Sequence, residues 1–147
     1  MLKSKTIILS LIVGAVLIQL IPYGKDHINP PVFTEPQWDS PKTKELFHNT
    51  CANCHSHETI YPWYSNVAPI SWLIQRDVDE GRAHLNISLL GIQKKNKVKD
   101  AAQEVREDEM PPFFYLPLHP EAKLSDADKA ALAKGLENTF GKETSQK

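Results

Sequence analysis

The hydrophobic residues form one long N-terminal run, followed by a chain in which they recur at helical spacing. The run covers Ile7 to Ile21 and is interrupted only by Ser10, Gly14 and Gln19. Farther along, apolar residues return at intervals of three and four, and no segment alternates as a strand does. The pattern predicts an all-α fold that is preceded by a membrane segment.

Capping residues mark the first and the last predicted helix of the soluble part. Ser40 followed by Pro41 is an N-cap and first-turn pair, and it opens a short helix that runs into Cys51. Ser125 caps the last helix, and Gly141 is expected to end it. The residues expected on the buried faces of these two helices are Leu46, Phe47, Thr50, Leu132, Leu136 and Phe140.

Two helices are predicted between them. One starts at Pro69 and Ser71, with apolar positions at Trp72, Leu73, Val78 and Leu85. The other spans Lys94 to Glu109, with a narrow apolar stripe at Val98, Ala101, Ala102 and Val105. It must stop before Met110-Pro111-Pro112, because proline disfavours the helical conformation in the preceding residue. The apolar stretch Pro112 to Pro117 is then expected to be an extended loop.

The N-terminal run has the composition of an export signal. Lys3 and Lys5 precede it, and no acidic residue occurs before Asp26. No Ala-x-Ala cleavage site follows, so an uncleaved anchor over residues 6–22 is favoured, although the run is short for a span of about 17 to 25 residues. The basic end stays in the cytoplasm, which places the soluble part on the periplasmic side of the inner membrane. The alternative is a cleaved signal and a soluble periplasmic protein.

The chemistry of the chain centres on Cys51-Ala52-Asn53-Cys54-His55, which has the spacing of a c-type haem attachment site. Two thiols about one helical turn apart each add to a haem vinyl group, and His55 then binds the iron from the proximal side. Cys51 and Cys54 are the only cysteines in the sequence. A covalent haem c is therefore the predicted cofactor.

Two other readings of these cysteines remain open. A dithiol redox pair of the thioredoxin kind normally lies in a βαβ unit, and the sequence shows no βαβ pattern. A structural zinc site would draw on Cys51, Cys54, His48, His55 or His57, but a second, distant ligand pair is missing.

The sixth position on the iron needs a methionine or another histidine. Met110 is the preferred candidate, because the other methionine, Met1, lies at the membrane end. Its rivals are His48, His57, His84 and His119, of which His119 is the best substitute. Trp63, Tyr64 and Arg76 are candidates for contacts in the haem pocket. Arg82 is a further candidate for a propionate partner, although a solvated surface charge is the preferred reading of either arginine.

Charge excludes one class of partner. Without Lys3, Lys5 and Lys25, 14 basic residues stand against 18 acidic ones, a net charge of -4. Nucleic acid is not expected, because it requires a basic face. The charge is compatible with a basic redox partner protein.

Beyond the haem motif, the chain resembles the haem-binding domain family of small exported monohaem c-type cytochromes, and more broadly class I cytochromes c. The residues that carry the resemblance are Pro36, Trp38, Cys51, Cys54, His55, Ser56, Tyr61 to Pro69, Trp72, Asp77 to Arg82, Glu109 to Pro111, His119 and Pro120. The resemblance implies one covalent haem, a mostly helical fold and an exported location.

The predicted organisation is a signal or anchor over residues 1–23, a proline-rich linker over 24–41, a haem-binding domain over 42–141 and a tail over 142–147. The expected function is one-electron transfer, without enzymatic activity, because an iron with six ligands has no open position for substrate. The alternative is a haem-based sensor, or an accessory to a peroxidase-type enzyme, in which Met110 is bound weakly or not at all.

Overall fold

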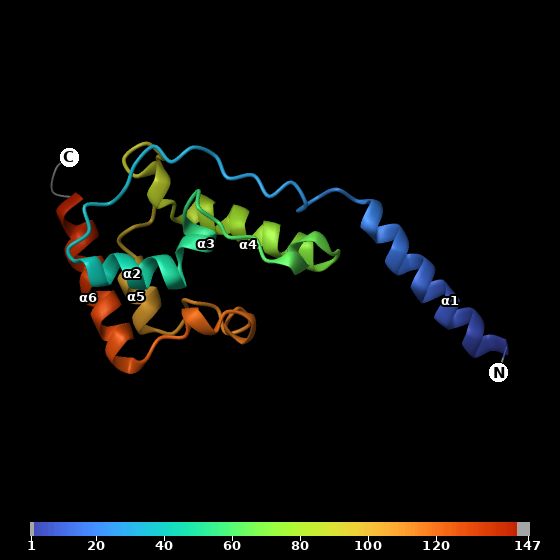
Figure 1. The fold of residues 1–147 in the computed structure, drawn as a ribbon. Coiled ribbons are helices and arrows are strands. Elements are labelled where there is room, and N and C mark those ends of the chain that lie inside the picture. Colours follow the sequence, from blue (N-terminus) through green and yellow to red (C-terminus); the bar gives the residue numbers. More distant parts are fainter. Residues whose placement is uncertain (1, 144–147) are drawn as a thin grey trace. The chain divides into compact units, whose positions relative to one another are not determined.

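The computed structural model describes residues 2–143, with side chains described for residues 3–141. Within that range it is helical and contains no strand, so the predicted all-α class is confirmed (Figure 1). The helices are α1 (Leu2–Leu17), α2 (Pro41–Thr50), α3 (Ala52–His55), α4 (Ile70–His84), α5 (Ala101–Arg106) and α6 (Asp126–Glu143). Short 3-10 turns occur at η1 (Ile18–Leu20), η2 (Trp63–Asn66), η3 (Ile87–Leu89), η4 (Leu116–Leu118) and η5 (Pro120–Ala122).

The chain divides into two compact units and passes between them three times, after Ile28, after Ile60 and, within α4, after Asp77. The N-terminal unit holds the residues up to Ile28 together with Tyr61–Asp77. The motif unit holds Asn29–Ile60 together with the chain from Val78 onward. The boundaries predicted from the sequence, by contrast, follow the order of the chain, and they remain predictions.

The core of the motif unit forms where α6 packs against α5 and α2 (Figure 1). Leu132, Leu136 and Phe140 are buried on one face of α6, as their spacing predicts. Gly135 lies on α6 against Thr43 of α2, and a Cβ added there would come 2.0 Å from the Thr43 Oγ1. Glycine therefore permits the close approach of these two helices.

Side-chain caps begin α2 and α6 as the sequence predicts. The Ser40 Oγ accepts a hydrogen bond from the Thr43 N–H at 3.2 Å, and the Ser125 Oγ accepts one from the Asp128 N–H at 3.1 Å. The predicted end of α6 at Gly141 is wrong, because the helix continues to Glu143. Gly141 is not among the residues with positive φ, and the left-handed conformation is what makes glycine a helix terminator. Residues 144–147 of the predicted tail lie outside the described residues.

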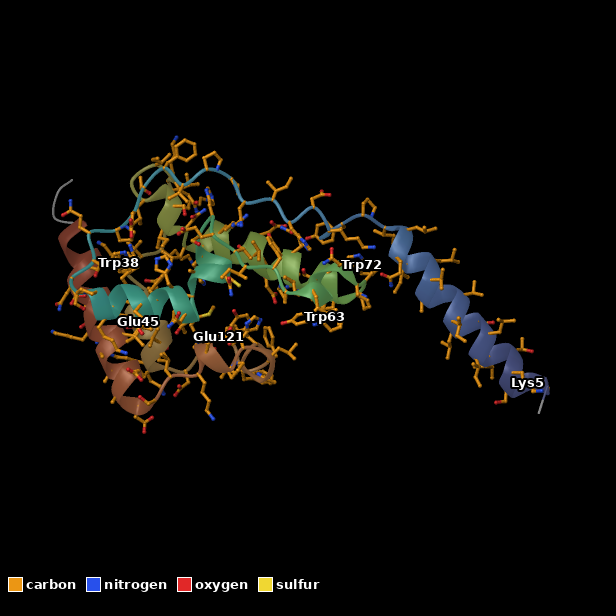
Figure 2. The ribbon with its side chains drawn as sticks, in the orientation of Figure 1. Lys5, Trp38, Glu45, Trp63, Trp72 and Glu121 are labelled. Carbon is orange, nitrogen blue, oxygen red and sulfur yellow. The ribbon has the colours of Figure 1, made fainter. Side chains whose placement is uncertain are left out.

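The proline-rich linker contains no helix, and its second half is part of the motif unit. The Thr34 Oγ1 donates to the Ile87 carbonyl at 2.9 Å and accepts from the Leu90 N–H at 2.8 Å. Trp38 packs against Phe47 and Phe140, with ring centroids 5.1 and 6.4 Å apart (Figure 2). Trp38 is thus a packed aromatic residue at the edge of the core of the motif unit.

Three local predictions are wrong. Of the helix predicted over 94–109, only Ala101–Arg106 is helical. Asn96 in the preceding segment pairs instead with the Asn86 backbone, accepting from its N–H at 3.1 Å and donating to its carbonyl at 2.8 Å. Leu73, expected on the buried face of α4, is 58% exposed. The stretch 112–117 folds into turns and part of η4, and is not extended.

Candidate functional site

The haem motif occupies a single helical turn at the junction of α2 and α3. The Cys51 N–H bonds the Phe47 carbonyl at 2.8 Å, which completes α2. The Cys51 carbonyl then accepts from the N–H groups of Cys54 and His55, at 3.1 and 3.0 Å. Residues three and four apart on such a turn lie on the same face. The local backbone therefore brings the two thiols and the imidazole to one side of α3.

Both cysteines are half-buried thiols that form no disulfide. Cys51 also borders the hydrophobic core of the motif unit. Burial, and to a lesser extent the neighbouring Cys54, raise the pKa of the Cys51 thiol to about 12. Dithiol redox proteins require the opposite, a lowered pKa that supplies a thiolate near neutral pH. The raised pKa of Cys51 therefore does not favour a dithiol redox pair.

The His55 ring is oriented by two backbone carbonyls of α4 and the residue after it. Its Nδ1 lies 3.1 Å from the Gly81 oxygen and 2.9 Å from the Leu85 oxygen. Because a carbonyl oxygen only accepts, Nδ1 must carry the proton, and Nε2 keeps its lone pair. Burial lowers the pKa of His55, and the two carbonyl bonds oppose this only in part. The side chain is a neutral imidazole with Nε2 prepared for a metal, as in histidines oriented by outer-shell acceptors.

Gly81 allows α4 to approach the motif closely enough to supply these carbonyls. A Cβ at Gly81 would lie 2.5 Å from the Cys54 carbonyl oxygen and 2.9 Å from the Cys54 Cβ. Any other residue would therefore push α4 away from α3. Gly81 has no role in the predictions made from the sequence, although a glycine in the middle of a predicted helix is a signal of close packing.

Arg82 holds the loop that follows the motif. Its Nε donates to the Ser56 carbonyl at 2.9 Å, and one terminal nitrogen reaches the Asn29 Oδ1 at 2.8 Å and the Thr59 Oγ1 at 3.0 Å. The reading of Arg82 as a solvated surface charge is therefore wrong. The rigid fork of donors on a guanidinium suits it to bonding several acceptors at once.

Both ring nitrogens of His57 lie within hydrogen-bond distance of other groups of the protein. The Asn86 amide nitrogen lies 2.9 Å from its Nε2, and the Pro31 carbonyl lies 2.7 Å from its Nδ1. The amide donates and the carbonyl accepts, so both ring nitrogens have partners and His57 is a poor ligand for any metal. Among the described residues, no group of three or more His, Cys, Asp and Glu side chains is placed to hold a metal ion. The zinc reading is therefore not supported by the arrangement of the side chains.

A second contact joins the motif to the segment after Met110. The Asn53 amide donates to the Tyr115 hydroxyl at 2.8 Å. The Tyr115 ring stacks on His119 at a centroid distance of 3.9 Å, and the His119 Nδ1 lies 2.8 Å from a Glu121 carboxylate oxygen. His119, the rival ligand, thus has its Nδ1 engaged by a carboxylate.

Met110 is half-buried just after α5, and its N–H bonds the Glu104 carbonyl at 3.1 Å. Its role as the ligand opposite His55 remains a prediction. Trp63, Tyr64 and Arg76 belong to the N-terminal unit, whereas Cys51, Cys54 and His55 belong to the motif unit. Their contacts with the cofactor also remain predictions.

A helical domain that presents two thiols and a carbonyl-oriented imidazole on one turn has the donor set of a haem protein. The family model described as the haem-binding domain matches residues 13–138, most of the chain. The chain belongs to this haem-binding domain family, and haem is its cofactor. Comparison with curated proteins and with solved structures gives no match.

Proposed function

We propose that this protein is a monohaem c-type cytochrome, anchored to the inner membrane, that carries single electrons on the periplasmic side. The observation that carries the proposal is the pair of carbonyl contacts to the His55 Nδ1, at 3.1 and 2.9 Å. They fix the tautomer that leaves Nε2 available, at the one position in the chain that also follows two thiols at the attachment spacing.

Cys51 and Cys54 would hold the macrocycle through thioethers, each formed by addition of an S–H group across a vinyl double bond. The bound haem supplies one-electron chemistry between ferric and ferrous iron. His55 would bind the iron in both states without reorienting, because its ring is already held by backbone. A fixed ligand reduces the rearrangement that must accompany each electron transfer, which suits a carrier better than a catalyst.

Met110 is the proposed sixth ligand. A thioether opposite histidine raises the reduction potential. The Asn53–Tyr115 hydrogen bond fastens the segment five residues after Met110 to the motif helix, which supports a loop held near the haem. A closed coordination sphere has no site for substrate, so enzymatic activity is not part of the proposal. The partner would be a redox protein with a basic docking face, since the chain after residue 25 carries excess negative charge.

The anchor is supported by the contacts that the end of the span and the residues after it make with the Tyr61–Asp77 segment. Lys3–Leu20 forms the one helical segment in the described chain that is long and apolar enough to cross a membrane, a test that a signal sequence also passes. Gln19 pairs with the Ala68 backbone, and His27 stacks on Tyr61 at 4.4 Å. Cleavage between these two residues would remove the Gln19 pairing, so the contacts favour retention of the segment.

Attachment is tested by producing the full chain with export and haem-ligation machinery. The intact mass should include one haem, and the colour should stay with the protein after extraction with acidified acetone. The Cys51→Ser and Cys54→Ser double variant should lose covalent haem, whereas His48→Gln, on the same helix but outside the motif, should keep it. Haem that leaves the wild-type protein into the solvent would overturn the c-type assignment and leave a non-covalent haem protein.

A further inference from the structure

The N-terminal unit carries an exposed surface without charge. From Tyr61 to Gln75 there is no Asp, Glu, Lys, Arg or His, in a protein whose residues are 24% charged. Four large apolar side chains of this stretch are exposed: Trp63 by 79%, Val67 by 42%, Ile70 by 41% and Leu73 by 58%. Clusters of exposed apolar side chains mark surfaces that are covered by another partner.

Gln19 ties this stretch to the end of the membrane helix. The Ala68 N–H donates to its Oε1 and its Nε2 donates to the Ala68 carbonyl, both at 2.9 Å. Gly24 adds a second attachment, because a Cβ there would lie 2.2 Å from the Ser71 carbonyl oxygen. The two contacts connect the end of the span and the residues after it to the segment between η2 and α4 and to the first turn of α4.

The pairing sets the depth of the surface in the membrane. The 18 residues Lys3–Leu20 rise by about 27 Å as a helix, close to the roughly 30 Å of the hydrocarbon core. Gln19 therefore lies at the exported edge of that core, and Ala68 lies beside it. Val67 and Ile70 are one and two residues from Ala68, so they are within about 8 Å of it. The headgroup layer is about 5 to 8 Å deep on each side, so both side chains are within reach of it.

We propose that the surface formed by Trp63, Val67, Ile70 and Leu73, here called the interfacial surface, is buried in the outer leaflet of the membrane that holds α1. The partner is the phospholipid layer itself. Trp63 projects from η2 (Figure 2), and tryptophan favours the level of the headgroups because its ring is amphipathic. The proposal rests on the anchor of the proposed function, since the depth of Ala68 follows from the depth of Gln19.

Contact between the interfacial surface and the lipid would add a second attachment to the membrane besides the α1 anchor. Without it, the part of the N-terminal unit outside the span would be held to the helix only by the Gln19 and Gly24 contacts. Burial of the interfacial surface fixes the unit against the leaflet, so that the linker starts at a defined height above the lipid. The uncharged composition of Tyr61–Gln75 suits this burial, because a charged side chain that penetrated into the hydrocarbon would lose its hydration.

The test uses the full chain with its haem, reconstituted in phosphatidylethanolamine and phosphatidylglycerol vesicles. A photoreactive benzoylphenylalanine replaces Trp63, and after irradiation the lipid adducts are counted by mass spectrometry. The same group at Lys134, exposed on α6 of the motif unit, reports collisional background. Position 63 should take several-fold more phospholipid than position 134. In the same labelled protein, Leu73→Asp should lower the yield at position 63 several-fold, whereas Ile92→Asp, at an equal 58% exposure, should not.

The outcomes separate the two proposals. Protein that stays in the vesicles after a high-salt wash but labels lipid equally at positions 63 and 134 would overturn the interfacial surface and leave the anchor standing. Adducts at position 63 to a second copy of the chain instead of lipid would overturn it in favour of a dimer contact. Protein that is released from the vesicles would overturn both. Covalent haem per chain, read from the optical spectrum, shows that each variant has folded.

Discussion

Gly81 of α4 packs directly against the backbone of Cys54, at a distance that leaves no room for a Cβ. The contact joins two functions of α4 in one place, because the carbonyl of the same glycine accepts from the His55 Nδ1 at 3.1 Å. The position of the iron ligand therefore depends on the absence of a side chain one helix away.

The first prediction follows from that contact. Gly81→Ala should destabilise the protein by about 1 to 3 kcal/mol through overpacking, although alanine is the better helix former by about 1 kcal/mol. Because the α4 carbonyls move away from His55, the variant should also show a lower yield of holoprotein. Thermal or chemical unfolding of the purified holoprotein, together with the haem-to-protein ratio, measures both effects.

The matched control is Gly141→Ala on α6, where an added Cβ meets no atom within 4 Å. That variant should be neutral or slightly stabilised. If the two glycine variants had the same stability to unfolding and the same haem-to-protein ratio, the approach of α4 to the motif would not depend on Gly81.

The second prediction concerns the sixth ligand. Met110→Ala should retain covalent haem, lose the weak near-infrared band of sulfur-to-iron ligation, bind CO readily when reduced, and fall in potential. His119→Ala should change little, because on this proposal the Met110 sulfur fills the sixth position. Spectra, CO binding and potentiometry on the two variants measure these effects.

A wild-type protein that is already high-spin and binds CO quickly would contradict the carrier and support the sensor or peroxidase-linked alternative. A spectrum that responds to His119→Ala and not to Met110→Ala would mean that the ligand is the histidine.

The third prediction concerns Arg82, which bonds Ser56, Thr59 and Asn29 around the loop after the motif. Arg82→Lys keeps the charge but loses the planar fork of donors, and a hydrogen bond to a charged group contributes a net of about 1.5 to 3 kcal/mol to stability. Since Arg82 is partly exposed, we expect the free energy of unfolding to fall by an amount near the lower end of that range. Denaturant unfolding of the holoprotein measures it.

Arg106→Lys is the control for the third prediction. Arg106 forms an exposed ion pair with Glu137 at 2.7 Å, and exposed pairs contribute little. If both lysine variants unfold at the same denaturant concentration, the bonds made by Arg82 do not hold the loop.

The fourth prediction concerns the N-terminus. The protein should stay with membranes after a high-salt wash, and the intact mass should include the first residues. Gln19→Leu should keep the protein in the membrane, because the span becomes more apolar, but it should expose the Ala68 amide to faster hydrogen exchange. A soluble product that starts near Pro22 to His27 would identify the segment as a cleaved signal.

The features that the sequence determined by itself are those controlled within one helical turn or by a regular period. Ser40 and Ser125 cap helices because each bonds an amide three residues away. The spacing of Cys51, Cys54 and His55 defines one turn, and the period of Leu132, Leu136 and Phe140 defines a buried face. Local geometry fixes all of these, so no knowledge of the rest of the chain is needed.

Only the tertiary structure decided the features that depend on residues far apart in the sequence. The carbonyls that orient His55 come from 26 and 30 residues away, and the bonds of Arg82 reach back 53 residues to Asn29. Pairing between Asn96 and the Asn86 backbone replaces helix where the local pattern favours it. In each case a polar group is satisfied by a partner that only folding brings near, and the periodicity of the sequence does not identify that partner.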